Sequence, residues 1–373
     1  MSMAAETVRL FLCGDVMTGR GIDQILPHAS NPILYEPYIG DARAYLDLAE
    51  KKNGPIPRGV DSEYIWGDAL EELERSSVDL RVLNLETAIT AADTNWPGKE
   101  IHYRMHPKNA GALVAAHIDI CALANNHVLD WGDSGLSETL LTLDKAGIAH
   151  AGAGIDSEQA ATPAIVDLRD KRRVLLFSFG SGDSGIPRDW GATENSPGVN
   201  LLDFSEATAS QIGNEVRRFQ QPDDLLIASI HWGANWGYEI PFEQIAFAHR
   251  LIAEGFALVH GHSSHHPKAI EVFNGRLILY GCGDFLTDYE GISGYENFHS
   301  DIAVIYLVDL NRSGELVSAR LVPMKMRRFQ LKRVGAGDSK DLHDLLNDLG
   351  APFGTSVRLE SDNNLRLAWH QLP

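Results

Sequence analysis

Apolar runs of strand length alternate with segments of helical periodicity along most of the 373-residue chain. The strand-like runs lie at residues 7–13, 79–86, 119–124, 172–180, 224–233 and 256–262. Helical patterns lie at about 41–52, 66–76, 107–116, 134–146, 205–219 and 241–254. Such alternation, with polar residues at the strand ends, predicts a layered α/β sandwich.

Later parts of the chain are richer in strands. The pair Asn274–Gly275 between two apolar runs predicts a tight hairpin turn. Residues 301–334 predict antiparallel strands, and residues 338–373 predict a helix and an extended tail. No stretch has the composition of a linker, so we predict that residues 1–373 form one domain with inserted loops. These loops lie at about 21–65, 93–109 and 181–201.

Composition narrows the class of protein. A hydrophobic fraction of 44% and a charged fraction of 22% are ordinary for a soluble globular protein. The formal net charge of −19 argues against a nucleic acid or an anionic membrane surface as a partner, because both require a basic face. The three cysteines lie in apolar runs without a disulfide pattern, which favours a reducing compartment. The chain shows neither a signal-peptide pattern nor a membrane-spanning window, so we expect a cytoplasmic protein without a membrane anchor; its pattern indicates no oligomeric state.

Several of the apolar runs end at a residue that can bind a metal or transfer a proton. These residues are Asp15, Glu86, Asn126 with His127, His231, and His262 with His265. Open α/β sheets build their active sites beyond the carboxyl ends of the strands, so we expect these side chains to meet in one cleft. Carboxylate, carboxamide and imidazole groups together are typical of a metal site.

The motifs around these residues resemble a known family. They are GDVMTGR at 14–20, NLE at 84–86, ANNHVLDWG at 124–132, HWG at 231–233, GHSSHH at 261–266 and YGCGDF at 280–285. In this order they resemble the CapA-like (poly-γ-glutamate capsule biosynthesis) family, within the calcineurin-like metallophosphoesterase superfamily, over about residues 8–290. The resemblance implies an αββα sandwich of mixed sheets flanked by helices, with a divalent-metal centre.

The resemblance also implies a ligand set. The metal ligands would be Asp15, Glu86, Asn126, His231, His262 and His265. Met17 stands where the superfamily has a histidine, and a thioether is a poor ligand for hard cations. Members of the superfamily usually hold two metal ions, so the resemblance implies that one of the two metal positions is weakened here. One or two ions of Ca²⁺, Mn²⁺, Mg²⁺ or Zn²⁺ are compatible with the remaining donors.

Other residues are candidates for catalysis and substrate binding. His127, Asp15 and His231 are candidate catalytic groups, and His299 joins them if the 286–301 loop folds over the cleft instead of staying on the surface. Asp130 and Asp284 either orient a histidine or cap a helix. The candidates for substrate contacts are Arg20 and Arg104 for an anionic group, and Trp131 and Trp232 for an apolar side chain.

These features predict a metal-dependent enzyme that uses His and Asp residues for acid–base chemistry on a peptide-like substrate. The two reactions that fit are amide hydrolysis of poly-γ-glutamate-type material and Cα epimerisation of a peptide. Some CapA-like proteins encoded beside lasso-peptide precursors, which this chain resembles, are peptide epimerases. A phosphoesterase is an alternative, which the altered ligands disfavour. A non-catalytic capsule-polymer assembly protein is another, which the intact motif loops disfavour.

Overall fold

The computed structural model describes residues 7–370, and their frame is two large mixed sheets. The strands of the first sheet are β1 (Val8–Val16), β2 (Leu80–Leu85), β5 (Ile120–Ala122), β6 (Ala149–Ala151), β16 (Asp284–Leu286), β17 (Ile302–Leu310), β18 (Leu316–Met326), β19 (Leu331–Arg333), β20 (Thr355–Leu359) and β21 (Leu365–Trp369). Those of the second are β8 (Ala164–Asp167), β9 (Arg173–Ser181), β11 (Leu201–Leu202), β12 (Leu225–His231), β13 (Leu258–His262), β14 (Ile270–Phe273) and β15 (Arg276–Leu279).

Helices and two small ribbons complete the frame. The helices are α1 (Arg20–Asp23), α2 (Arg43–Asn53), α3 (Asp68–Arg75), α4 (Gly111–Ala115), α5 (Gly132–Ala146), α6 (Ser157–Ala161), α7 (Glu206–Phe219), α8 (Phe242–Ala253) and α9 (Ala336–Gly350). The ribbons pair β3 (Ala88–Ile89) with β4 (Arg104–Met105), and β7 (Ala153–Gly154) with β10 (Gly198–Val199). Among the residues described, no helix is both long and apolar enough to span a membrane.

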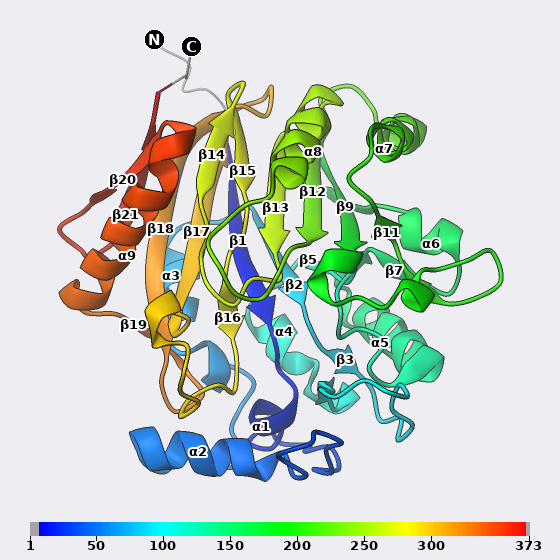
Figure 1. Ribbon diagram of the computed structural model, residues 1–373, viewed down its shortest axis with the longest axis vertical. Helices are drawn as coiled ribbons and strands as arrows, with labels where there is room; N and C mark the ends of the chain where they lie inside the picture. Colours follow the sequence, from blue (N-terminus) through cyan, green and yellow to red (C-terminus); the bar gives the residue numbers. More distant parts are fainter. Residues whose placement is uncertain (1–6, 371–373) are drawn as a thin grey trace.

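The strand order places β1 at the centre of the molecule (Figure 1). The first sheet runs β20-β21-β18-β17-β1-β2-β5-β6, and β16 pairs with the end of β1. The second sheet runs β11-β9-β12-β13-β15-β14. β1 is parallel to β2, and β12 is parallel to β13, so the carboxyl ends of these strands come together at one edge of each sheet.

Alternate side chains of each central strand reach different layers, as the pleat of a strand requires. In β1, Leu10 and Leu12 belong to a buried cluster shared by both sheets, whereas Phe11 belongs to a cluster that contains side chains of α3, α4 and α5. In β12, Ile227 joins the shared cluster and Ile230 joins one that contains side chains of α7 and α8. Two sheets therefore pack face to face with helices outside, which confirms the predicted αββα fold class.

The structure also confirms the predicted hairpin and corrects two details. β14 and β15 pair antiparallel around Asn274 and Gly275, which both have positive φ. The first strand was expected to end at residue 13, but β1 continues to Val16 because β2 and β16 pair with its end. The expected extended tail forms the hairpin β20–β21, whose Val357 is buried in the cluster between the sheets.

Candidate metal centre

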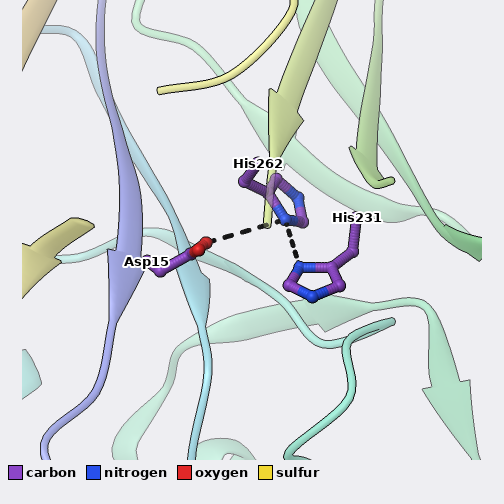
Figure 2. Close-up of side chains that lie close together, drawn as sticks. All are labelled: Asp15, His231 and His262. Atoms are coloured by element: carbon purple, nitrogen blue, oxygen red, sulfur yellow. Dashed lines mark hydrogen bonds and ion pairs between the residues drawn. The ribbon is translucent and has the colours of Figure 1, made fainter. Parts of the chain in front are cut away.

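Three strand ends bring Asp15, His231 and His262 together (Figure 2). His231 and His262 are register partners at the ends of the parallel strands β12 and β13, and Asp15 lies near the end of β1 in the other sheet. The Nδ1 atoms of the two imidazoles are 2.9 Å apart, and His262 Nδ1 is 3.9 Å from Asp15 Oδ1. All three side chains are fully or almost fully buried.

A second group contains Asp15 again, with His265 and Asp284. β16 runs parallel to β1, and Asp284 is the register partner of Asp15. His265 Nδ1 lies 2.8 Å from Asp284 Oδ1. In each group the candidate ligand atoms lie within 4.8 Å of one another, so Asp15 is common to two groups of metal-binding geometry.

Glu86 lies beside these groups, and Asn126 directly precedes His127 in the chain. Glu86 follows β2, and its Oε1 is 3.8 Å from His127 Nε2 and 4.0 Å from His231 Nε2. The amide of Asn84 donates to Asp15 Oδ1 at 2.7 Å and to Glu86 Oε2 at 3.1 Å, which fixes the two carboxylates relative to each other. The buried side-chain oxygen of Asn126 has no hydrogen-bond partner within residues 7–370.

The donor atoms of this site fit a divalent cation. Of the buried side-chain atoms without a hydrogen-bond partner among residues 7–370, three belong to candidate ligands of this site: His231 Nε2, Asn126 Oδ1 and Asp284 Oδ2. Leaving a buried polar atom unsatisfied costs about 1–3 kcal/mol, so such atoms in one place indicate a missing partner. An imidazole nitrogen, an amide oxygen and a carboxylate oxygen all offer a lone pair, which a metal ion accepts.

The charges of the site favour a cation as well. Burial, and then the charge of Asp284, raise the pKa of Asp15 to about 7. Burial and the nearby Asp15 raise the pKa of Glu86 well above its usual range. Burial holds the pKa values of His231 and His262 well below their usual range, so both imidazoles are neutral, as a metal ligand must be.

The raised pKa of Asp15 predicts how pH changes the stability of the metal-free protein. Between pH 3.8 and about 7 the unfolded chain releases the Asp15 proton while the folded chain retains it, so stability falls as pH rises. The unfolding free energy of metal-free wild type, relative to Asp15→Asn, should therefore decrease across this window and then level off. Urea unfolding of both proteins in chelator at several pH values tests this; a constant difference would contradict it.

His127 is held by a carboxylate and a buried lysine. Its Nδ1 lies 2.7 Å from Asp130 Oδ2, and Asp130 also accepts the backbone N–H of Tyr103 at 2.6 Å. Lys99 forms an ion pair with Asp130, and its Nζ lies 3.0 Å from His127 Nδ1. Burial lowers the pKa of His127 to about 4, so the ring is neutral, with Nε2 directed toward Glu86. Asp130, expected either to orient a histidine or to cap a helix, thus contacts His127 in the structure.

Sequence reasoning missed several polar residues that support the site. Asn84 and Asn125 are neighbours of the selected residues within the same motifs, and the Asn125 amide donates to Asn84 Oδ1 at 2.9 Å. Ser229 Oγ lies 3.0 Å from His262 Nε2, and it precedes His231 by two residues on β12, which puts both on one face. Lys99 lies in the inserted loop, where no pattern distinguishes it from a surface lysine.

Arg20 was expected to bind substrate, but its guanidinium already has partners. It forms ion pairs with Glu36 at 2.8 Å and with Asp288 at 2.5 Å, and it lies over the rings of Tyr45 and Tyr103. All of these groups are buried. Arg20 therefore fastens the inserted loop before α2 to the segment after β16, with its charge neutralised.

Replacement of Arg20 should lower the stability of the protein strongly. Arg20→Ala leaves two carboxylates buried without a cation, which costs about 3–5 kcal/mol of unfolding free energy. The control Arg43→Ala removes an exposed pair with Asp41, which contributes about 1 kcal/mol or less. Urea unfolding curves measure both, and equal effects of the two changes would refute the structural role of Arg20.

Arg104, Trp131 and Trp232 also differ from expectation, because they have internal partners. The Arg104 guanidinium donates to the carbonyl of Asn31 at 2.9 Å and lies over the Trp131 ring. The indole N–H of Trp131 donates to the Tyr103 carbonyl, and that of Trp232 to the Tyr280 carbonyl. Both tryptophans are buried. These side chains pack the walls of the site instead of facing substrate, since sequence alone cannot show long-range partners.

A cleft of about 1310 Å³ opens beside the centre. Its lining includes His265 and Asp284 from the second group, and His299 from the loop after β16. That loop packs against the segment after β12, because the rings of Tyr295 and Trp236 stack with centroids 4.0 Å apart. The loop over residues 286–301 thus forms a wall of the cleft, and His299 lies on that wall.

The lining also carries basic side chains. They are Lys52, Lys325, Arg327, Lys332 and Arg333. Lys325 pairs with Asp301, Lys332 with Asp68, and Arg333 with Glu72. Lys52 and Arg327 form no ion pair among residues 7–370, and neither do Glu290 and Glu296 of the same lining, so the cleft carries unpaired charges of both signs.

Comparisons with known proteins place the chain in a family. The model of the bacterial capsule synthesis protein family PGA_cap matches residues 9–289. A probable polyglutamine synthesis accessory protein of Mycobacterium tuberculosis is 44% identical over 97% of this chain and 96% of its own length. The PGA biosynthesis protein CapA of Bacillus subtilis is 26% identical over 76% of this chain and 70% of its own.

A more distant likeness appears among solved structures. The 5'-nucleotidase precursor of Thermus thermophilus is similar over 86% of this chain and 55% of its own, with a TM-score of 0.47 and 13% identity. That likeness is too weak to bear on activity. The family model and the Mycobacterium tuberculosis relative, which is similar over almost its full length, agree with the buried Asp/His centre. The chain belongs to the bacterial capsule synthesis protein family PGA_cap.

Proposed function

We propose that this protein is a metal-dependent enzyme that performs acid–base chemistry on a peptide-like chain rich in carboxylates. The observation that carries the proposal is that the buried centre opens into the large cleft. His265 and Asp284 belong both to the second ligand group and to the cleft lining. A substrate in the cleft would therefore contact the centre directly.

The residues of the centre would have two roles, metal binding and proton transfer. Asp15, His231 and His262 would hold the cation, with Glu86 and Asn126 within reach. When bound, a divalent cation acts as a Lewis acid that polarises a carbonyl oxygen or acidifies a water molecule. His127 is neutral and oriented by Asp130, so its Nε2 is able to accept and return a proton. His299 on the cleft wall offers a second imidazole.

The cleft lining offers contacts to a polymer that carries carboxylates. Lys52 and Arg327 lie along it without an ion pair among residues 7–370, and Arg guanidinium groups bind carboxylates in a bidentate manner. Two relatives carry names that refer to polyglutamine or PGA synthesis. A glutamate- or glutamine-type peptide therefore matches these names and offers groups that the two basic residues could bind.

Two reactions are compatible with a bound cation and these two imidazoles. Amide hydrolysis needs a polarised carbonyl and one proton carrier, and Cα epimerisation needs two proton carriers on opposite sides of the carbon atom. His127 beside the centre and His299 on the cleft wall are the two imidazoles that would have these roles.

Incubation with glutamate oligomers, linked through either the α- or the γ-carboxylate, in deuterated water and with added divalent metal separates the two reactions. Hydrolysis produces new chain termini, and epimerisation adds one deuterium at a Cα without cleavage; mass spectrometry detects both. The proposal fails if neither product forms. Phosphate release from an aryl phosphate would then indicate a phosphoesterase, and binding of the oligomer without turnover would indicate an assembly protein.

A further inference from the structure

A contact between two glycines brings two carboxylates together. Gly14 precedes Asp15 on β1, and Gly283 precedes Asp284 on β16. A Cβ atom on Gly14 would lie 1.6 Å from the carbonyl oxygen of Gly283, so another residue at Gly14 would force the strands apart. With glycine there, the Asp15 N–H donates to the Gly283 carbonyl at 3.0 Å. β16 lies beside the end of β1 (Figure 1), and Asp15 and Asp284 are register partners there.

These two carboxylates have no lysine or arginine paired with them in the described chain. Asp15 is fully buried and Asp284 is 3% exposed. Asp15 accepts from Asn84 and from the Ser263 backbone, and Asp284 contacts His265 through Oδ1 while its Oδ2 has no partner among residues 7–370. The nearby buried cations pair elsewhere, Arg20 with Asp288 and Lys99 with Asp130. Like charges buried this closely are unfavourable, and among residues 7–370 the imidazole of His265, 2.8 Å from Asp284 Oδ1, is the group that offsets them in part.

We infer that Asp284 is a direct metal ligand, which forms with Asp15 and His265 a second cation position beside the one at Asp15, His231 and His262. This inference rests on the metal centre of the proposed function. Asp15 would bridge the two positions, because it belongs to both groups. Two oxygen donors and one imidazole suit Mn²⁺ or Zn²⁺, and other hard cations with added water.

The second position explains how the chain tolerates methionine at residue 17. Met17 is buried, and its sulfur accepts a hydrogen bond from the Tyr289 hydroxyl at 3.7 Å. It therefore does not replace the imidazole that the superfamily pattern leads one to expect there. Asp284 supplies a donor on the neighbouring strand instead, so the second cation position keeps a full set of side chains. The weakening expected from Met17 is thereby offset.

Asp284 has an alternative role, which a single substitution separates from ligation. If it only orients His265, its function is the 2.8 Å contact between Oδ1 and Nδ1. Asp284→Asn keeps one acceptor oxygen for that contact and replaces the second carboxylate oxygen, Oδ2, with an amide NH2, which has no lone pair to offer a metal. The orienting role therefore survives the change, and ligation through Oδ2 does not.

The test is metal loading of the chelated full-length protein with Mn²⁺, read by elemental analysis and by electron paramagnetic resonance. Wild type should bind two ions that show a spin-coupled spectrum, since they share a carboxylate. Asp284→Asn should bind one ion with an isolated six-line spectrum. Glu296→Gln, a matched change of an exposed acid on the same cleft, should keep two. His265→Gln, which replaces another candidate ligand of the same group, should also bind one ion.

The outcomes distinguish this inference from the proposed function. Two ions in Asp284→Asn would show that Asp284 only orients His265, and would overturn the inference. A single ion in wild type would also overturn it, while the metal-dependent function would stand. No ion in wild type would remove both. If Asp284→Asn does not fold, as judged by circular dichroism, Asp284→Ser, which also removes the carboxylate and keeps one oxygen, is judged by the same readouts and the same outcomes.

Discussion

Replacing Asp15 with alanine should remove bound metal and all turnover while leaving a cooperatively folded protein. Asp15 is the one residue common to both ligand groups found among residues 7–370, so its replacement removes a ligand from both groups. Loss of a group that only supports a ligand already weakens metal binding about 10–100-fold. Loss of a ligand that both groups share should weaken metal binding by more than this factor. Folding should survive, because the change also removes a buried carboxylate from beside Asp284.

Isothermal titration of the chelated proteins with Zn²⁺ measures this effect. The control is Asp309→Ala, which removes an acid from the adjacent strand β17 at the opposite end of β1, where it pairs with Arg9. The control should bind metal as wild type does. Wild-type affinity in Asp15→Ala would contradict the assignment of Asp15 as a ligand.

Replacing His127 with alanine should abolish turnover and leave the metal in place. His127 belongs to neither of the two ligand groups, yet it lies 3.8 Å from Glu86 and is oriented by Asp130. A positioned acid–base group contributes about 10²–10⁴-fold to the rate, so kcat on the glutamate oligomer should fall by that factor. The metal content should equal that of wild type.

A histidine elsewhere in the fold provides the matched control. His249 also pairs with a carboxylate, Glu271, but it lies on α8 on the outer face of the second sheet. His249→Ala should keep wild-type turnover. Full turnover in His127→Ala would remove His127 from the mechanism, and loss of metal from that variant would make it a ligand instead of a proton carrier.

The residues at the ends of the parallel strands were the part of the site that the sequence predicted best. An apolar run predicts a strand, and the polar residue at its end predicts a position at the edge of the sheet. His231 and His262 follow this logic, because β12 and β13 are parallel neighbours in register. The same pattern selected Asp15, although it lies in the other sheet and only the packing of the two sheets brings it near the two histidines.

Other parts of the site depend on long-range pairing that no local pattern encodes. Asp284 is 269 positions from its register partner Asp15 (284 minus 15), and the short β16 gives little periodicity to identify it as a strand. Arg20 looked like an anion-binding group because its partners Glu36 and Asp288 lie in irregular segments. The role of a charged side chain is set by its partners, so its type and motif alone were insufficient.

Elemental analysis of the purified protein before chelation, after chelation and after reloading shows whether the buried centre binds metal. We expect a stoichiometric divalent metal that chelation removes and reloading restores, in wild type and in His127→Ala but not in Asp15→Ala. Absence of metal from the purified protein, with no uptake on reloading, would contradict it. The buried carboxylates and imidazoles at the strand ends would then have a role other than binding a catalytic metal.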